Sequence, residues 1–180
     1  MDSAHHVADF LPPICRTSKQ LYAEATPEYI KSRCFMLSDR SSAQLLRGWL
    51  STLSLGFTSI RALNVSLCGS RHDYHDATGA VACHWALILR CQNLTHLTIR
   101  LPNYSEVLVA RRCSDPKDPR WESRMRLLQL EKLVEVKRLR VLMLHGVWLA
   151  LRTWVDYVFR VERPDVVVKM YGKGGLLLVR

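Results

Sequence analysis

One apolar spacing occurs three times in the chain, and it constrains the fold more than any other feature. Residues 60–67 (IRALNVSL), 94–101 (LTHLTIRL) and 139–144 (LRVLML) place apolar residues at their first, fourth and sixth positions. The fourth and sixth residues point to one face of a strand, because side chains alternate along an extended chain. The first residue then packs beneath the preceding helix. This L-x-x-L-x-L spacing is typical of the strand portion of a leucine-rich repeat.

Helical periodicity fills most of the sequence between these strands. It predicts helices over residues 41–55, 77–91, 122–136 and 149–161, the first of them capped by Ser41 or Ser42. Further strands are predicted at 34–37, 166–170 and 176–179, and the last can run antiparallel because a glycine-rich turn precedes it. The alternation of strands and helices predicts an α/β fold.

We expect residues 1–180 to form a single domain, an irregular leucine-rich-repeat-like stack of strand–helix units. The repeats are offset by 34 and 45 residues, and the polar segment 111–120, which holds two prolines, reads as a loop insertion that lengthens the second unit. A doubly wound α/β sheet with apolar strands is the alternative. No G-x-G-x-x-G follows any predicted strand, so a dinucleotide-binding fold is disfavoured.

An amphipathic helix precedes the repeats. Ile14, Leu21, Ala25 and Tyr29 recur at helical offsets and predict its buried face. Pro27 is expected to end or kink the helix, because proline lacks the backbone donor and crowds the preceding turn. We expect this helix to cap the open end of the stack, where an unpaired apolar layer would otherwise face water.

The chain is basic, with 26 Lys and Arg against 16 Asp and Glu and a formal net charge of +10. Its basic residues are dispersed rather than clustered, so a nucleic-acid binder remains only an alternative function. The sequence has no secretory signal, no 18-residue apolar run and no C-x-x-C pair among its six cysteines. We therefore expect an intracellular protein, cytoplasmic or nuclear, with reduced thiols and no membrane contact.

The strongest candidate for chemistry is the segment RHDYHD, which concentrates His72, Asp73, His75 and Asp76. Imidazole and carboxylate groups together can hold Zn²⁺, so a metal-dependent hydrolase is a second alternative. The spacing differs from H-E-x-x-H on a helix, and Asp76 is equally suited to cap the helix that follows. We expect a polar loop here, with no metal and no cofactor.

A non-catalytic protein-interaction module is the favoured function, because no complete catalytic motif is present. In a stack of parallel strands the residues between the inward positions form one exposed surface. The candidates on that surface are Asn64, Ser66, His96, Thr98, Arg100, Met143 and His145. Trp121 and Trp148 are added because aromatic residues are enriched at binding surfaces. The basic Arg100 favours an acidic protein partner.

Residues 1–40 resemble a known family pattern. The segment PPICRTSKQLYAEATPEYIKSRCFML matches C-R-x-S-[RK]-Q-x-x-x-E-A-x-P, followed by an aromatic residue and an apolar strand. This pattern is similar to that of the F-box-like family of uncharacterised fungal proteins, which implies Leu-rich α/β segments and substrate recognition of the F-box-associated type. The L-P-x-E-I segment that opens an F-box is not found. The family resemblance implies a Skp1-type adaptor as a partner. The F-box motif that would bind this adaptor is not found in the sequence.

Overall fold

Six strands form one sheet, and they lie in the order in which they occur in the chain. The computed structural model describes residues 12–67, 77–101, 128–147, 149–172 and 175–179. The strands are β1 (Cys34–Leu37), β2 (Ala62–Ser66), β3 (His96–Arg100), β4 (Val141–His145), β5 (Val167–Gly172) and β6 (Gly175–Val179). Neighbours from β1 to β5 are parallel, and β6 pairs antiparallel with β5. A doubly wound sheet requires a reversal of strand order, so that alternative is wrong.

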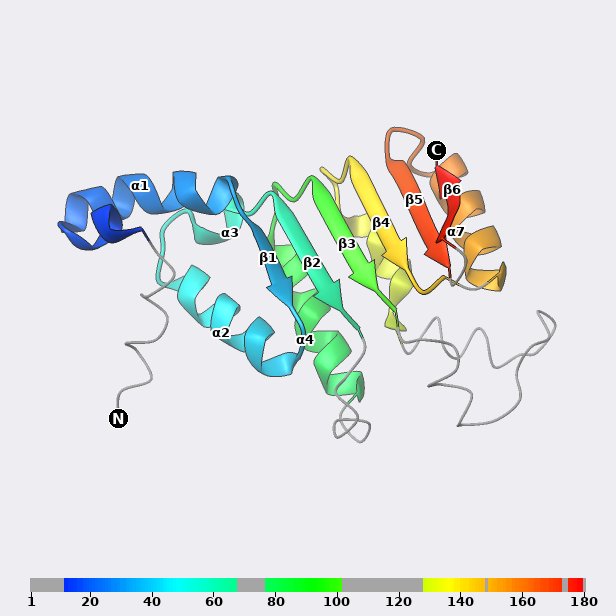
Figure 1. Ribbon diagram of the computed structural model, residues 1–180, viewed down its shortest axis with the longest axis horizontal. Coiled ribbons are helices and arrows are strands. Elements are labelled where there is room, and N and C mark those ends of the chain that lie inside the picture. The colour runs from blue at the N-terminus through cyan, green and yellow to red at the C-terminus, as the bar shows by residue number, and fades with distance from the viewer. Residues whose placement is uncertain (1–11, 68–76, 102–127, 148, 173–174, 180) are drawn as a thin grey trace.

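Helices of the described residues lie between successive strands from β1 to β5, and two more precede β1. They are α1 (Lys19–Lys31), α2 (Arg40–Ser51), α3 (Gly56–Ser59), α4 (Ala77–Arg90) and α7 (Leu149–Val161), with 3₁₀ helices η2 (Pro13–Arg16) and η4 (Leu130–Glu135). Figure 1 shows α4, η4 and α7 behind the sheet. The ring of Phe35 in β1 lies 6.3 Å from that of Trp49 in α2, so α2 packs on the same side of the sheet. The mixed α/β class predicted from the sequence is confirmed.

The core lies between the sheet and these helices, and the repeated spacing supplies much of it. The nine side chains at the first, fourth and sixth positions of the three repeats are all buried, as predicted; they are Ile60, Leu63, Val65, Leu94, Leu97, Ile99, Leu139, Leu142 and Leu144. Burying each of these side chains stabilises the fold by roughly 1.5–3 kcal/mol relative to leaving it exposed. The repeated pattern therefore fixes which side of β2, β3 and β4 faces the helices.

Backbone hydrogen bonds repeat where the strands begin. The N–H groups of Thr95 and His96 both donate to the Arg61 carbonyl at 2.9 and 3.0 Å. One strand further on, Arg140 and Val141 both donate to the Thr95 carbonyl at 2.9 Å. The same local geometry therefore recurs between β2 and β3 and between β3 and β4, although the chain between them differs in length.

The N-terminal helix differs from the prediction in its start, its end and its buried face. It begins at Lys19, after the separate η2 turn, with Ser18 accepting from the Leu21 N–H at 3.0 Å. It runs through Pro27 to Lys31, and its buried residues are Thr26, Pro27 and Ile30. Pro27 therefore does not end the helix, which continues for four residues beyond it.

The buried stripe predicted for this helix is only partly right. Leu21 is 37% exposed, while Ala25 and Tyr29 are half-buried against the core. Ile14 belongs to η2 rather than to α1, so the two do not share one helical phase. Cys15 is buried, as expected for a small apolar residue. The helix packs against α3.

Two other predicted boundaries shift. Asp39, rather than Ser41 or Ser42, caps α2, and its carboxylate accepts from the Ser42 N–H at 2.7 Å while the Ser42 hydroxyl accepts from the Asp39 N–H. The hydrogen bonds that the carboxylate accepts, first from the Ser42 N–H and then from the Ser38 hydroxyl, lower the pKa of Asp39, because they stabilise its charged form. The helix predicted at 122–136 is, in its described part, the 3₁₀ helix η4.

A buried imidazole joins α4 to the start of α2. His84 is 1% exposed, and its Nε2 lies 3.2 Å from the Asp39 carbonyl oxygen, which can only accept a hydrogen bond. Burial lowers the pKa of His84, and the contact with Asp39 opposes this effect only in part. His84 is therefore neutral in the folded protein near pH 7.

The neutral state of His84 makes stability depend on pH. The ordinary pKa of histidine is 6.5. Below this pH His84 binds a proton in the unfolded chain but stays neutral in the folded protein, so stability is lost as the pH falls. Between pH 6.5 and 5.5 we expect the wild type to lose up to about 1 kcal/mol more than a His84→Gln variant. Urea unfolding at each pH measures this, with exposed His96→Gln as control. Equal pH dependence in wild type and His84→Gln would contradict the expectation.

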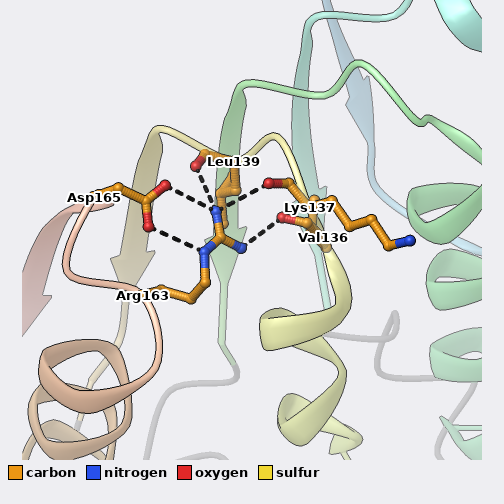
Figure 2. A network of polar contacts seen from close by, with 5 residues as sticks. All are labelled: Val136, Lys137, Leu139, Arg163 and Asp165. Atoms are coloured by element: carbon orange, nitrogen blue, oxygen red, sulfur yellow. Dashed lines mark hydrogen bonds and ion pairs between the residues drawn. The ribbon is translucent and has the colours of Figure 1, made fainter.

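One arginine fastens the entry of β5 to the turn that precedes β4 (Figure 2). Arg163 donates through Nη1 to the Val136 carbonyl at 2.8 Å, and through Nη2 to the carbonyls of Lys137 and Leu139 at 3.2 and 3.0 Å. It also contacts both carboxylate oxygens of Asp165 at 3.2 Å, and these bonds lower the pKa of Asp165. The side chain of Arg163 is only 14% exposed. The acceptors of Arg163 all belong to the chain itself, so this network holds the segment before β5 against the turn before β4.

Candidate interaction surface

The side of the sheet opposite the helices carries the predicted candidate residues. We call this side the open face and define it by the strand positions that alternate with the buried ones: Cys34, Met36, Ala62, Asn64, Ser66, His96, Thr98, Arg100, Val141, Met143, His145, Val167, Lys169 and Tyr171. None of the helices in the described part of the chain covers this face (Figure 1). A surface four to five strands wide therefore lies outside the core.

The strand register arranges these residues in three rows across the sheet. The first row is Cys34, Ala62, His96, Val141 and Val167; the second is Met36, Asn64, Thr98, Met143 and Lys169. The third row is Ser66, Arg100, His145 and Tyr171. Adjacent members of a row lie about 4.8 Å apart, the spacing between neighbouring strands. The alignment expected for the seven sheet candidates is thus present.

The rows differ in chemistry and in exposure. The first row is apolar apart from His96, and Cys34, His96 and Val167 are exposed. In the second row Met36 is 70% exposed, but Thr98 in the centre of the sheet is only 8% exposed. Thr98 is therefore a weaker contact candidate than expected, because Asn64 and Met143 flank it on both sides.

The third row concentrates polar and aromatic groups. The His145 and Tyr171 rings stack with their centroids 4.6 Å apart and their planes 7° apart. Partial burial lowers the pKa of His145, and the positive charge of Arg100 on the neighbouring strand lowers it further. The row therefore already has a positive potential that opposes a proton on His145.

The glycine after His145 holds the end of this row in place. Gly146 has φ +80°, and a Cβ atom there would lie 2.8 Å from the Leu101 carbonyl oxygen. Its N–H donates to the Tyr171 carbonyl at 2.9 Å, and the Leu101 N–H donates to the His145 carbonyl at 2.9 Å. A residue with a side chain would be strained here and would push β3 and β4 apart.

Lys169 and Tyr171 are polar open-face residues that the sequence analysis did not predict as candidates. They belong to β5, whose sequence lacks the L-x-x-L-x-L spacing. A weaker signal was available, because Val166, Val168 and Met170 alternate as buried residues and leave 167, 169 and 171 for the opposite side. The predicted candidates Trp121 and Trp148 lie outside the described residues.

The other predicted candidates for chemistry cannot be placed among the described residues. The HDYHD segment with His72, Asp73, His75 and Asp76 lies outside them. Within the described ranges no three His, Cys, Asp or Glu side chains are arranged to hold a metal ion. No helix among these ranges is long and apolar enough to cross a membrane.

Two of the four described thiols, Cys34 and Cys91, have a raised pKa. Cys15 and Cys91 are buried, and burial raises the pKa of Cys91 to about 12. Burial also raises the pKa of Cys34, although this residue is exposed at the edge strand. A thiol with a raised pKa stays protonated near pH 7, and the thiolate is the reactive form. Cys34 and Cys91 are therefore poorly suited to act as nucleophiles near pH 7.

Comparison with known proteins adds no assignment. No protein-family model, curated protein or solved structure matches this chain.

Proposed function

We propose that the chain is a non-catalytic interaction module whose open face binds an acidic segment of a protein partner. The observation that carries the proposal is the charge of this face. Arg100 and Lys169 lie on it, and none of the residues in the six described strands is Asp or Glu. A partner with carboxylates would find cationic groups on the described strands and no carboxylate among them.

The proposal includes a leucine-rich-repeat-like architecture, capped at the β1 end by α1. It is supported by the sequential parallel strands, by the recurring hydrogen bonds at Arg61 and Thr95, and by helices on one side of the sheet. In such a stack each unit contributes one strand to a continuous face, so a partner can contact several units at once. This geometry suits an extended partner segment that crosses the strands.

An acidic protein segment fits the face better than nucleic acid. Binding to a nucleic-acid backbone depends on many phosphate contacts, and its affinity falls steeply with salt. The open face offers two permanent cations, Arg100 and Lys169, beside an apolar first row. Apolar contacts together with a few charges are typical of a protein interface.

We also propose that the chain belongs to the F-box-like family that its first forty residues resemble, and that it acts inside the cell, in the cytoplasm or nucleus. The four described cysteines are all free thiols, which agrees with a reducing compartment. Mixing the purified chain with a Skp1-type adaptor tests the family's partner directly. A stable complex on size-exclusion chromatography would support an adaptor role. Two separate peaks would exclude binding to the Skp1-type adaptor and would leave the proposed interaction of the open face untouched.

Charge reversal on the open face is expected to abolish partner binding. In a displayed library of short peptides, the wild type should enrich acid-rich sequences. Arg100→Glu combined with Lys169→Glu should reduce affinity for these peptides by about 10–100-fold, because two attractions become repulsions. Fluorescence anisotropy with the enriched peptides at fixed salt measures the change.

The matched control reverses charge on the helical side of the molecule. Arg47 is exposed on α2, so Arg47→Glu combined with Lys19→Glu changes the net charge by the same amount away from the open face. This control should bind as the wild type does. Equal loss in both double variants would mean that net charge alone drives binding, and enrichment of neutral peptides would reject the acidic partner.

A further inference from the structure

The five parallel strands all begin along one edge of the sheet, the upper edge in Figure 1. We call it the amino edge and define it by the five connections that enter these strands: residues 31–33, 52–61, 91–95, 136–140 and 162–166. The structure describes all of them. They hold two acids, Glu162 and Asp165, against seven basic residues, which are Lys31, Arg33, Arg61, Lys137, Arg138, Arg140 and Arg163. The surplus of five is half of the formal net charge of +10, so the fold gathers cations that are dispersed in the sequence.

Strand pairing aligns three of these arginines along the amino edge. Strands β1 and β2 pair in register, so Arg33 and Arg61 precede neighbouring strands. The Arg61 carbonyl accepts from the Thr95 N–H, and the Thr95 carbonyl accepts from the Arg140 N–H, both at 2.9 Å. The Arg61 side chain is held in place, because its Nη1 donates to the Asn93 carbonyl at 3.1 Å. Three strand spacings, about 14 Å, therefore separate the backbones of Arg33 and Arg140.

The turn before β4 supplies three cations without an acidic partner. Lys137, Arg138 and Arg140 are exposed, and within the part of the chain that the structure describes their side chains form no hydrogen bond or ion pair. By contrast, Lys31 and Arg163 already pair with carboxylates. The cations of this turn are therefore available to an anionic ligand.

Arg163 sets the conformation of that turn. It donates to the carbonyls of Val136, Lys137 and Leu139, and Figure 2 shows the Lys137 side chain extending away from the guanidinium. Carbonyl oxygens would repel an anion, but here they are bonded to a cation. Glu135 ends η4 next to the turn, and it forms no ion pair among the described residues. The turn is therefore a preorganised cationic element, which lowers the cost of binding.

The exposed chemistry of the edge suits phosphate groups better than a protein surface. In the turns before β3 and β4 the apolar side chains are all buried; they are Cys91, Leu94, Val136 and Leu139. Only polar and cationic side chains are left outside, whereas a protein interface has an apolar centre. Binding to a phosphate backbone depends mainly on charge, and guanidinium groups match phosphate oxygens with two parallel hydrogen bonds.

The edge lacks a free aromatic ring on which single-stranded bases could stack. Phe57 is the one aromatic residue of the five connections, and the Arg90 guanidinium lies over its ring, 3.9 Å from the centroid. Proteins that bind single strands stack successive bases on exposed aromatic rings. The amino edge therefore suits a duplex, in which the bases are already stacked on one another.

We propose that the amino edge binds the phosphate backbone of a double-helical nucleic acid. The contacts come from the cations without an acidic partner: Arg33, Arg61, Lys137, Arg138 and Arg140. Their span of about 14 Å is comparable to the major groove, which is roughly 12 Å wide, so they can reach phosphates on both sides of it. Phosphate contacts carry no sequence information, so binding is independent of sequence. This site goes beyond the proposed function and lies apart from the third row of the open face.

Binding of a fluorescein-labelled DNA duplex of about 20 base pairs, followed by fluorescence anisotropy, tests the proposal. The wild type should bind two unrelated sequences equally, and its affinity should fall between about 50 and 200 mM salt. Lys137→Gln, Arg138→Gln and Arg140→Gln together should weaken binding at least about 10-fold at the lower salt concentration. The same variant should reduce the slope of log K against log salt by about 2–3, because three phosphate contacts are lost.

The control variant removes the same net charge elsewhere. Lys19→Gln, Arg47→Gln and Arg152→Gln together change three helical residues outside the five connections. This variant should bind the duplex as the wild type does, with an unchanged salt slope. Circular dichroism checks that both triple variants are folded.

The outcomes separate this inference from the proposed function. Equal losses in both triple variants would mean that net charge alone drives binding, and they would overturn the inference. Tighter binding of the corresponding single strand, or no binding of the duplex, would also overturn it. Loss of the acid-rich peptides rather than the duplex in the amino-edge variant would make the edge a protein-binding surface instead. Duplex binding that survives Arg100→Glu combined with Lys169→Glu would support a site separate from the open face.

Discussion

Replacing Trp85 by alanine is expected to lower the free energy of unfolding by about 3–5 kcal/mol. Trp85 is fully buried in α4, and its indole Nε1 donates to the Leu128 carbonyl at 2.8 Å. The substitution leaves a large cavity behind the sheet and a buried carbonyl without its donor, and each of these effects destabilises the fold. Urea unfolding followed by circular dichroism measures the loss.

Two further variants separate the causes. Trp85→Phe keeps most of the ring but removes the donor, so it should cost about 1–3 kcal/mol, mainly through the orphaned Leu128 carbonyl. Trp154→Ala, at a half-buried position on α7, should cost less than Trp85→Ala because less apolar surface is removed from contact. Equal losses for Trp85→Ala and Trp154→Ala would show that Trp85 does not hold the layers together.

Replacing Arg163 by methionine is expected to lower the free energy of unfolding by about 2–4 kcal/mol. Three backbone carbonyls of the turn before β4 lose a charged donor, and the ion pair with Asp165 is lost (Figure 2). Methionine retains much of the apolar stem, so the loss reports on the guanidinium. Arg163→Lys keeps the charge but not the fork, and should recover less than half of the loss.

A neighbouring arginine provides the control for this measurement. Arg160 lies in the last turn of α7 and pairs with Asp156 at 2.7 Å, but its side chain is 64% exposed. Because exposed ion pairs contribute little, Arg160→Met should change stability by no more than about 0.5 kcal/mol. If Arg163→Met changes the free energy of unfolding as little as Arg160→Met does, water satisfies the carbonyls of Val136, Lys137 and Leu139. The network then does not stabilise the turn.

Local patterns were sufficient wherever one periodicity dominated the sequence. Strand β1 and helix α7 begin and end where the sequence predicted, and the predicted antiparallel last strand is present. Strands β2, β3 and β4 lie within one or two residues of their predicted bounds. Alternation along a strand and its apolar spacing are properties of neighbouring residues, so the chain alone reveals them.

Prediction was weaker where several local signals competed. The phase of α1 was wrong because the η2 turn separates Ile14 from the helix, and Pro27 proved compatible with a helical interior. The cap of α2 was misplaced because Asp39, Ser41 and Ser42 are all suitable caps by residue type. Only the backbone geometry selects among them.

The candidate surface shows the same division. The side of the sheet on which Asn64, Arg100 and His145 lie followed from the repeated spacing. The low exposure of Thr98, the contribution of Lys169 and the stacking of His145 on Tyr171 did not, because they depend on which strands are neighbours and in what register. A shift of one residue in that register would have sent each of these side chains to the core.

The sequence by itself determined the α/β class, most strand positions and the inward face of each strand, because these depend on the periodicity of neighbouring residues. The tertiary structure alone decided the sequential strand order, the three rows of the open face and the partners of His84, Trp85 and Arg163. Those features join residues 24 to 45 positions apart in the chain, and no local pattern encodes such distances. Packing of the apolar faces against one another sets these features, and it also sets which residues lie on the open face.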